Sequence, residues 1–208
     1  MLEIIHDKFC GCKRDPVKTR ELLLHAAYSQ IHLRGFQAVS LDEILRDTGV
    51  TKGALYHHFP NKTALGYAVV DEVIGPSLEN FWLKPVLQAE DPLAALEQVI
   101  RTAGDEMTLS DVKLGCPLNN LSQEMSAADE GFRVRLQAIY ENWRNGLSTA
   151  FKHAQDNGHM ADQHDPEATA TFIVASLEGC IGMAKTAQDL DVLMQCGTGV
   201  IRYLRSLR

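Results

Sequence analysis

Residues 40–63 read SLDEILRDTGVTKGALYHHFPNKT and carry the signals of two very short helices joined by a tight turn. Ser40 and Glu43 have the spacing of a capping box, which starts the first helix. Thr51 is placed to cap the second helix. Gly49 lies at the corner between them, where a positive φ is expected and glycine adopts it with little strain. This stretch therefore predicts a helix-turn-helix.

The second of these helices predicts a contact surface. Leu55 and Phe59 lie four positions apart and are expected to hold its inner face against a core. A helix this short is not stable alone, so neighbours must hold it while its outer face meets another molecule. His58 adjoins Phe59 and is left out of the contact set. The outer face consists of donors with little bulk, namely Lys52, Gly53, Tyr56 and His57.

The rest of the chain has the periodicity of helices. Apolar residues recur with helical spacing almost everywhere, and no alternating strand pattern stands out, so the predicted fold class is all-α with about nine helices. Pro76 and Pro85 are expected to end or kink the helix that begins near Asn61, because each lacks a backbone donor. Three aspartate–proline pairs, at residues 15–16, 91–92 and 165–166, predict helix starts. The helices are expected over residues 16–34, 41–47, 52–58, a kinked piece 62–75 and 77–84 that counts as one helix, 92–109, 117–126, 129–157, 166–187 and 190–206.

The composition excludes several classes of protein. The chain has 208 residues, of which 45% are hydrophobic and 23% charged, with 7 prolines, so it is neither disordered nor collagenous. The longest apolar run, residues 172–184, is too short to cross a bilayer and holds Glu178 in its middle, so no membrane partner is expected. The first residues lack the features of a secretion signal, which predicts a cytoplasmic location.

Charge divides the chain into two predicted domains. The net charge of -7 is the sum of +2 over residues 1–63 and -9 over residues 64–208. The split is compatible with a small cationic module that touches a polyanion and an acidic body with another task, and also with simple solvation of both parts. Basic residues around the first helix could follow a phosphate backbone or be an ordinary solvated helix start. They are Lys13, Arg14, Lys18 and Arg20.

The cysteines predict neither a disulfide framework nor a metal site. Their number is odd and their positions are scattered, as in a reducing compartment. Cys180 and Cys196 fall inside predicted helices and are interpreted as packing residues. A structural zinc site needs four ligands at workable spacing, and the group His6, Cys10 and Cys12 has no second pair nearby. No metal and no cofactor is therefore expected.

The pattern TR..LL..A......GF.A.SL.EI...TGVTKGALYHHFPNK..L, from Thr19 to about Leu65, resembles the DNA-binding module of the TetR/AcrR family of transcriptional regulators. The resemblance implies an amino-terminal three-helix bundle with a helix-turn-helix over residues 1–63, and a larger helical effector-binding and dimerisation domain over residues 64–208. It also implies that the second short helix lies in the major groove and that Lys62 meets a phosphate. The implied DNA-binding set is Ser40, Thr51, Lys52, Gly53, Tyr56, His57 and Lys62.

The chemistry of these residues agrees with the implied roles. Lys52 and His57 carry donors suited to base edges or phosphates, and the Tyr56 hydroxyl suits a backbone phosphate. Gly53 lets the helix backbone approach the duplex closely. Lys62 is expected beside free amides at a helix amino terminus, where an anion is also favoured by the helix dipole. The alternative is that Tyr56 and the histidines only cover a small core.

Two stripes near the carboxyl terminus predict a homodimer seam of four helices, as the resemblance also implies. The alternative is a core within one chain. Two-fold symmetry would then predict a palindromic operator, with recognition helices about 34 Å apart or a multiple of it. The first stripe is mostly small and consists of Ala168, Phe172, Ala175, Gly179 and Gly182. The second consists of Leu190, Leu193, Met194, Gly197, Ile201 and Leu204.

An effector site is expected in the body. Pro117 suits a first helical position, which places Cys116 at the cap, where the dipole lowers a thiol pKa. The stretch resembles a branch of the family with Gly-Cys here, some of whose members respond to electrophiles or oxidants. A small buried cysteine is the alternative. Asn119, Asn120 and Glu124 are candidates to orient a polar ligand, and Tyr140 and Trp143 are the aromatic candidates for a pocket.

The sequence thus predicts a homodimeric DNA-binding regulator, a repressor of a palindromic operator that a small molecule or electrophile releases. The effector would act by shifting the helix from Asn61 to Ile74, which connects the body to the DNA-binding module. One alternative is a thiol-dependent helical enzyme that uses Cys116 with His153 or His159. Another is a DNA-binding protein that responds to no effector.

Overall fold

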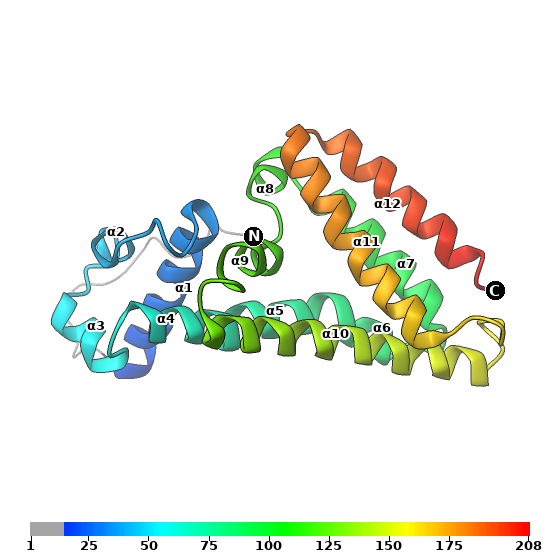
Figure 1. The fold of residues 1–208 in the computed structure, drawn as a ribbon, viewed down its shortest axis with the longest axis horizontal. Coiled ribbons are helices and arrows are strands. Elements are labelled where there is room, and N and C mark those ends of the chain that lie inside the picture. Colours follow the sequence, from blue (N-terminus) through cyan, green and yellow to red (C-terminus); the bar gives the residue numbers. More distant parts are fainter. Residues whose placement is uncertain (1–14) are drawn as a thin grey trace.

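The computed structural model describes residues 15–208, which form an array of helices with no strand. Figure 1 shows the first three helices at one end of an elongated molecule, and α7, α11 and α12 at the other. None of the described helices combines the length and apolar character that crossing a membrane requires. The expectations on His6, Cys10, Cys12, Lys13 and Arg14 lie outside the described residues.

The bounds of the elements are as follows: α1 Pro16–Arg34, α2 Leu41–Leu45, α3 Lys52–His58, α4 Lys62–Val69, the π-helical turn η1 Val70–Ile74, α5 Gly75–Leu78, the π-helical turn η2 Glu79–Leu83, α6 Lys84–Leu87, α7 Pro92–Glu106, α8 Leu109–Leu114, α9 Pro117–Met125, α10 Glu130–Asp156, α11 Pro166–Ala187 and α12 Leu190–Arg205.

The all-α class and the amino-terminal helix-turn-helix are confirmed, together with the signals that predicted them. Ser40 and Glu43 form a reciprocal capping box at the start of α2. Thr51 Oγ1 accepts a hydrogen bond from the amide of Ala54, 3.2 Å away, and so caps α3. Gly49 has a φ of 63° at the corner. These local signals set where the two helices start and where the chain turns, and packing against the first core stabilises them.

The helical run from Lys62 to Leu87 ends at neither proline. α4, η1, α5, η2 and α6 follow one another without a break, and a π-helical turn directly precedes each proline-containing segment. Pro76 and Pro85 each lie at the second residue of such a segment. A proline ring collides with the carbonyl four residues before it, and a wider turn places an extra residue there. The run therefore crosses both prolines.

The segment after α7 differs from the expected single helix over residues 92–109. α7 ends at Glu106, and Thr108 starts the separate helix α8 through a capping box with Asp111. Gly115, with a φ of 73°, closes α8. Cys116 then caps α9 and Pro117 is its first residue, as predicted. This short, sharply turned segment lies between the two ends of the molecule.

Two hydrophobic cores are linked by α10, which contributes buried residues to both. The first core packs α1–α4 and η1 against Leu118 of α9 and Phe132 of α10. The second packs α7, α11 and α12 against Trp143 and Phe151, which lie further along α10. α10 therefore touches both cores, whereas α9 packs into the first core alone.

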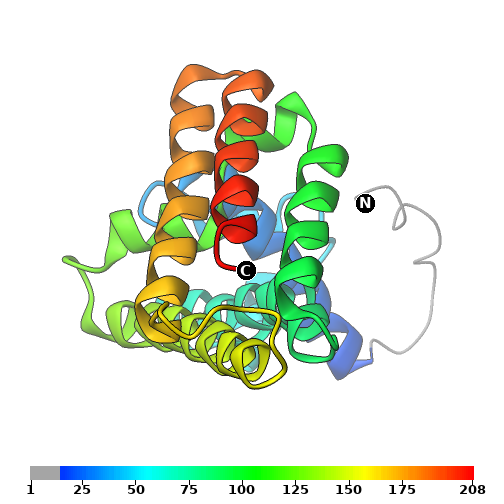
Figure 2. The same cartoon turned by 90° about the vertical axis from the view of Figure 1, so that its right-hand side faces the viewer.

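α11 and α12 form an antiparallel hairpin along one side of the body, and they lie side by side in both views (Figure 1, Figure 2). Cys180 and Cys196 face each other across the hairpin with their Cα atoms 5.5 Å apart and form a disulfide. The interpretation of both as packing residues without a disulfide was wrong. The pairing needs the hairpin, which brings together two residues that the cysteine spacing alone did not connect.

The second predicted seam stripe lies mainly on the inner face of α12. Ile201 and Leu204 are buried in the second core. Leu193, Met194 and Gly197 line a cavity inside the body. The interpretation of Ile201 and Leu204 as surface for a partner is therefore corrected, because the apolar face of a helix covers its own core first, whereas Met194 keeps 44% of its surface exposed. On α11, by contrast, Ala168, Phe172, Ala175 and Gly179 are exposed.

Candidate functional site

The outer face of α3 is open to solvent. Lys52, Gly53 and His57 are exposed, and Tyr56 keeps 50% of its surface accessible. Leu55 and Phe59 are buried in the first core and hold the helix from behind. The donors that the sequence predicted as one contact face therefore do lie together on one exposed helix.

Lys52 forms an ion pair with an acidic neighbour. Its ammonium lies 2.8 Å from the carboxylate of Asp42 on α2, and this hydrogen bond raises the pKa of Lys52. Both side chains are exposed, so the pair contributes little to stability and exchanges readily for another anion. A Cβ built on Gly53 would meet only Thr51 Oγ1, at 3.9 Å. The space beyond Gly53 is open to a large partner.

The hydroxyls of Ser40 and Thr51 already serve their helix caps. Ser40 Oγ accepts from the Glu43 amide at 3.2 Å and donates to the Glu43 carboxylate at 2.9 Å. Thr51 Oγ1 accepts from Ala54. Both residues are exposed. Since each oxygen has a second lone pair, it remains an acceptor or donor for a partner at the amino-terminal edge of its helix.

Lys62 lies in a more enclosed place than expected. Its ammonium donates to the Gln37 carbonyl at 3.2 Å and lies 4.7 Å above the Phe36 ring. Burial lowers its pKa. The amide of Ala64, which was expected to be free for an anion, donates to Asn61 Oδ1 at 2.7 Å. A phosphate contact by Lys62 thus requires the side chain to leave Gln37.

Arg20 is also committed within the fold. Its guanidinium makes two hydrogen bonds to the Glu72 carboxylate and lies 5.0 Å from the Phe59 ring centroid. Lys18 is exposed. Of the described members of the basic group, only Lys18 extends freely into solvent, and Arg20 instead ties α1 to η1.

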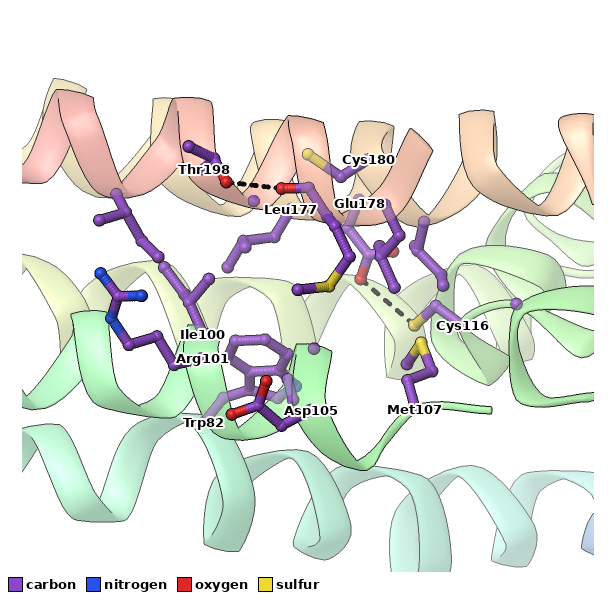
Figure 3. A pocket seen from close by; sticks show the side chains of 18 of the residues that line it. Trp82, Ile100, Arg101, Asp105, Met107, Cys116, Leu177, Glu178, Cys180 and Thr198 are labelled. Carbon is purple, nitrogen blue, oxygen red and sulfur yellow. Dashed lines mark hydrogen bonds between the residues drawn. The ribbon is translucent and has the colours of Figure 1, made fainter. Parts of the chain in front are cut away.

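A cavity of about 280 Å³ lies in the body. Its walls come from α7, α11, α12 and the turn between α8 and α9, together with Leu78 of α5, Trp82 of η2 and Trp143 of α10 (Figure 3). Most of the lining is apolar or aromatic, as in ligand sites generally. The aromatic, sulfur-containing and acidic side chains of the lining include Trp82, Met107, Cys116, Trp143, Glu178 and Met194.

Cys116 and Glu178 meet in this cavity. The thiol donates to Glu178 Oε1 across 3.4 Å (Figure 3). Burial, together with the nearby Glu178 charge, raises the pKa of the thiol, and burial raises the pKa of Glu178 to about 7. The predicted lowering of the thiol pKa by the helix dipole was wrong, because burial and a neighbouring acid outweigh a helix terminus. The sequence analysis missed Glu178 as a site residue, although an acid amid an apolar run was the available signal.

The two aromatic candidates do not share this site. Trp143 lines the cavity and is 4% exposed, and within residues 15–208 its indole Nε1 has no hydrogen-bond partner. Tyr140 instead borders a separate hollow between α9, α10 and α11. Burial raises the pKa of its hydroxyl. Only Trp143 therefore faces the space in which Cys116 lies.

Asn119 and Asn120 hold the structure together rather than face the cavity. The Asn119 amide donates to the Glu178 carbonyl at 3.3 Å. The Asn120 amide donates to the Leu114 carbonyl at 2.7 Å and accepts from the Lys185 ammonium at 2.8 Å. Both side chains line a different, polar hollow between α1 and α9. The five predicted effector residues thus fall into three places.

α9 connects the cavity to the helix-turn-helix. At its amino-terminal end, the Gly115 carbonyl lies 2.8 Å from His32 Nε2 of α1. Further along, the Glu124 carboxylate accepts from the amides of Phe36 and Gln37, at 2.9 and 2.7 Å. Glu124, expected to orient a ligand, instead binds the loop that leads into α2. The connector expected from the sequence, residues 61–74, consists of α4 and η1. Its η1 part contacts α10 through an ion pair of 3.0 Å between Asp71 and Arg135.

Comparisons with known proteins agree with this layout. Residues 23–69 match the family model of bacterial regulatory proteins, tetR family, and residues 92–197 match that of the tetracyclin repressor-like carboxyl-terminal domain. The chain is 33% identical to the transcriptional regulator AcuR of Cereibacter sphaeroides over 182 residues, 86% of this chain and 82% of that protein. It is 28% identical to the transcriptional repressor DhaR of a Mycobacterium species, over 82% of this chain and 84% of that one.

Solved structures give the same picture. A crystal structure of a regulatory protein TetR from Rhodobacter sphaeroides has a TM-score of 0.78 and 31% identity to this chain, covering 88% of it and 97% of the other chain. The E. coli NemR structure in its reduced form has a TM-score of 0.77 at 24% identity, over 88% of this chain and 95% of that one, and shows the shared fold. The relatives carry names of transcriptional regulators rather than of enzymes.

Proposed function

This chain belongs to the TetR family of bacterial regulatory proteins and is a DNA-binding transcriptional regulator. From that premise we propose that it is a homodimeric repressor of a palindromic operator. In this proposal a small molecule releases the repressor from its operator. The observation that carries the proposal is the exposed donor face of α3, which is fixed to the first core by Leu55 and Phe59. Residues 1–63 are the proposed DNA-binding domain, and residues 64–208 the effector-binding and dimerisation domain.

In this proposal α3 enters the major groove. Lys52 exchanges Asp42 for a guanine edge or a phosphate, while His57 donates to a base and Tyr56 to a phosphate. Ser40 and Thr51 lie at the edge of the groove, where the second lone pair of each hydroxyl oxygen can accept a hydrogen bond from a base. Gly53 lets the helix backbone come close to the DNA. Lys62 reaches a phosphate after leaving Gln37. The positions of these side chains on one open surface support the assignment.

The proposed dimer surface is the outer face of α11. Phe172 is 51% exposed and Met183 63%, which is unusual for large apolar side chains. Between them, Ala175 and Gly179 are small and exposed, so a second helix could approach closely. The Phe172 ring rests on Tyr203 of α12 at 4.8 Å between centroids, which extends the surface onto the next helix. A two-fold axis through this face would present two α3 helices to successive grooves.

The proposed route of release runs through α9. An effector in the cavity contacts Gly115 and Cys116, and the Gly115 carbonyl forms a hydrogen bond with His32 of α1. The other end of α9 holds the Phe36–Gln37 amides through Glu124. A displacement of α9 therefore moves α1 and the entry to α2, and changes the distance between the two recognition helices. The helix from Asn61 to Ile74, proposed from the sequence as the connector, moves with them through Arg20 and Glu72.

The raised thiol pKa favours a reversibly bound effector over an electrophile. An electrophile reacts with the thiolate, and the surroundings of Cys116 disfavour that form. A thiol-dependent enzyme would need the same thiolate. We therefore propose that Cys116 acts as a hydrogen-bonding part of the cavity wall, and that modification by an electrophile is the second candidate trigger.

The test is DNA binding by a purified dimer. Fluorescence anisotropy on DNA from the promoter next to the gene should give tight, salt-dependent binding, and light scattering should give twice the chain mass. Lys52→Ala should lower operator affinity and reduce the salt slope by about one unit. Lys113→Ala, at an exposed lysine of α8 outside every proposed contact set, is the matched control. A monomer in solution would refute the proposed dimer, and equal loss in both variants would refute the assignment of α3 as the reader.

A further inference from the structure

Glu178 is the only buried acidic or basic side chain among residues 15–208, with 9% of its surface exposed. Oε1 accepts from Cys116, but Oε2 is buried and has no hydrogen-bond partner in that part of the chain. An unpaired carboxyl oxygen in the interior is costly unless a partner is supplied. Glu178 lines the cavity and also the adjoining hollow between α9, α10 and α11, so a molecule inside the cavity is one source of that partner.

The aromatic walls of the cavity suit an apolar body. Trp82 and Trp143 line it together, with ring centroids 5.7 Å apart, and offer a large apolar surface. Met107 and Met194 add polarizable side chains that adapt to an apolar body. Such a lining suits the apolar part of a ligand.

The formal charges of the lining favour a cationic group on that ligand. Its acids are Glu178 in the interior and Asp105, which is exposed. Its one basic residue is Arg101, whose guanidinium is held by Glu97 at 2.9 Å and extends away from Glu178 (Figure 3). An anionic ligand in this cavity would therefore meet a buried carboxyl, and the one cation of the cavity lining is already paired with Glu97. A cationic ligand would neutralise Glu178.

We propose that this cavity binds a compact, mostly apolar organic amine in its cationic form, with the ammonium group donating to Glu178 Oε2 and the apolar part against Trp82 and Trp143. The proposal rests on the proposed function, in which the cavity receives the effector. The unpaired Trp143 Nε1 offers a donor to an oxygen atom on the same ligand.

The protonation of Glu178 gives the interaction a pH dependence. Burial raises the pKa of Glu178 to about 7. An ammonium ion favours the carboxylate, so amine binding strengthens as pH rises through 7 and releases a proton from Glu178. Among the described residues, α8 and α12 place no titratable side chain in the cavity lining. The titratable and charged groups near Glu178 are Cys116, Arg101 and Asp105 at the cavity, and Arg133, Tyr140 and Arg144 at the adjoining hollow.

The experiment uses the full chain without DNA and three probes of nearly equal size: phenethylamine, phenethyl alcohol and phenylacetate. The chain has two tryptophans, and both line the cavity, so intrinsic fluorescence reports on this site. Titration calorimetry in buffers of different ionisation enthalpy measures proton release. The variants are Glu178→Gln, which keeps the side-chain shape, and Glu167→Gln, an exposed change on the same helix, as the control.

We expect phenethylamine to bind at least about tenfold more tightly than phenethyl alcohol, and phenylacetate to bind least. Glu178→Gln should abolish the preference for the amine while alcohol binding persists, and Glu167→Gln should change neither. Equal binding of amine and alcohol, preference for phenylacetate, no amine binding at millimolar concentration, or an amine preference that survives in Glu178→Gln would each overturn the proposal. If Glu178→Gln does not fold, proton release from the unaltered protein on amine binding decides the question.

Operator release is measured separately, by anisotropy with phenethylamine added. Amine binding at Glu178 without release would leave the cavity assignment standing and refute the effector role of this cavity. Loss of DNA binding in every condition would refute the proposed function and leave the amine preference to be judged on its own result.

Discussion

The Cys116 thiol donates to the Glu178 carboxyl across 3.4 Å, inside the cavity of the body. The two groups influence each other: the acid raises the pKa of the thiol, and the thiol hydrogen bond partly offsets the burial that raises the pKa of the acid. The state in which Cys116 is a thiolate and Glu178 is a carboxylate at the same time is therefore disfavoured. A cysteine that looked reactive from its place at a helix terminus is held as a thiol by its tertiary neighbour.

The first prediction concerns the reactivity of Cys116. At pH 7 its alkylation by iodoacetamide should be far slower than that of free cysteine, because little thiolate is present. Glu178→Gln should speed the reaction several-fold, since it removes the charge that opposes the thiolate. Mass spectrometry of the Cys116 peptide gives the rate. A native rate equal to that of free cysteine would restore the electrophile trigger.

The second prediction links Glu178 to stability. Its folded pKa of about 7 lies above the ordinary value of 4.5, so its contribution is fully present below about pH 4.5 and is lost as pH rises through 7. Relative to Glu178→Gln, the unaltered protein should lose at most about 3 kcal/mol of unfolding free energy between pH 5 and pH 8. Urea unfolding at both values measures this. Parallel pH curves for the two proteins would contradict it.

The third prediction concerns the ion pair of Lys52 and Asp42. Asp42→Asn should raise affinity for operator DNA roughly two- to fivefold at low salt, because the ammonium no longer has to leave a carboxylate to meet the DNA. Anisotropy at several salt concentrations checks this. Glu90→Gln, a change at an exposed acid of the body, controls for net charge. Weaker binding by Asp42→Asn would mean that Asp42 positions Lys52 rather than competing with DNA.

The fourth prediction tests the clamp made by Glu124. Glu124→Ala leaves the Phe36 and Gln37 amides without their acceptor, so their hydrogen exchange should speed up about tenfold. Gln123→Ala, at an exposed neighbour on α9, should leave these amides unchanged. Exchange measured by mass spectrometry on peptides over this loop decides between the two. If both variants behave alike, Glu124 does not tie α9 to the helix-turn-helix.

The fifth prediction concerns the disulfide between Cys180 and Cys196. Because it closes a loop with a sequence separation of 16, Cys196→Ser should lower the unfolding free energy by about 2–3 kcal/mol. A reducing agent should lower the melting temperature of the unaltered protein and leave that of the variant unchanged. Calorimetry with and without dithiothreitol measures both. If the melting temperature of the unaltered protein is the same with and without reductant, the disulfide does not form in solution.

The helix-turn-helix could be predicted because its determinants are local. A capping box spans four residues, a turn needs one glycine, and the inner face of α3 needs two apolar residues four apart. Each signal acts within one or two turns of the chain, so the order of residues reveals it. The contact between Lys62 and Gln37 was not predictable in this way, since it joins residues 25 positions apart.

The effector cavity shows the opposite case. Cys116 and Trp143 share it, whereas Asn119, Asn120 and Tyr140 do not, although all five are similarly suited to a ligand by their chemistry. Which of them share a space depends on how α9, α10 and α11 cross. A side chain half a turn further along a helix points elsewhere, and helical periodicity alone does not tell which face meets which neighbour.

The order of amino acids by itself determined the helical class, the caps, the glycine corner and the donor face of α3, because these arise from interactions between residues close in the chain. Only the tertiary structure decided that Glu178 faces Cys116, that Cys180 meets Cys196, and that the apolar stripe of α12 covers its own core. Those outcomes depend on helix crossing and burial. Burial, which removes water from a charged group, is a property of the packed molecule and of no single segment.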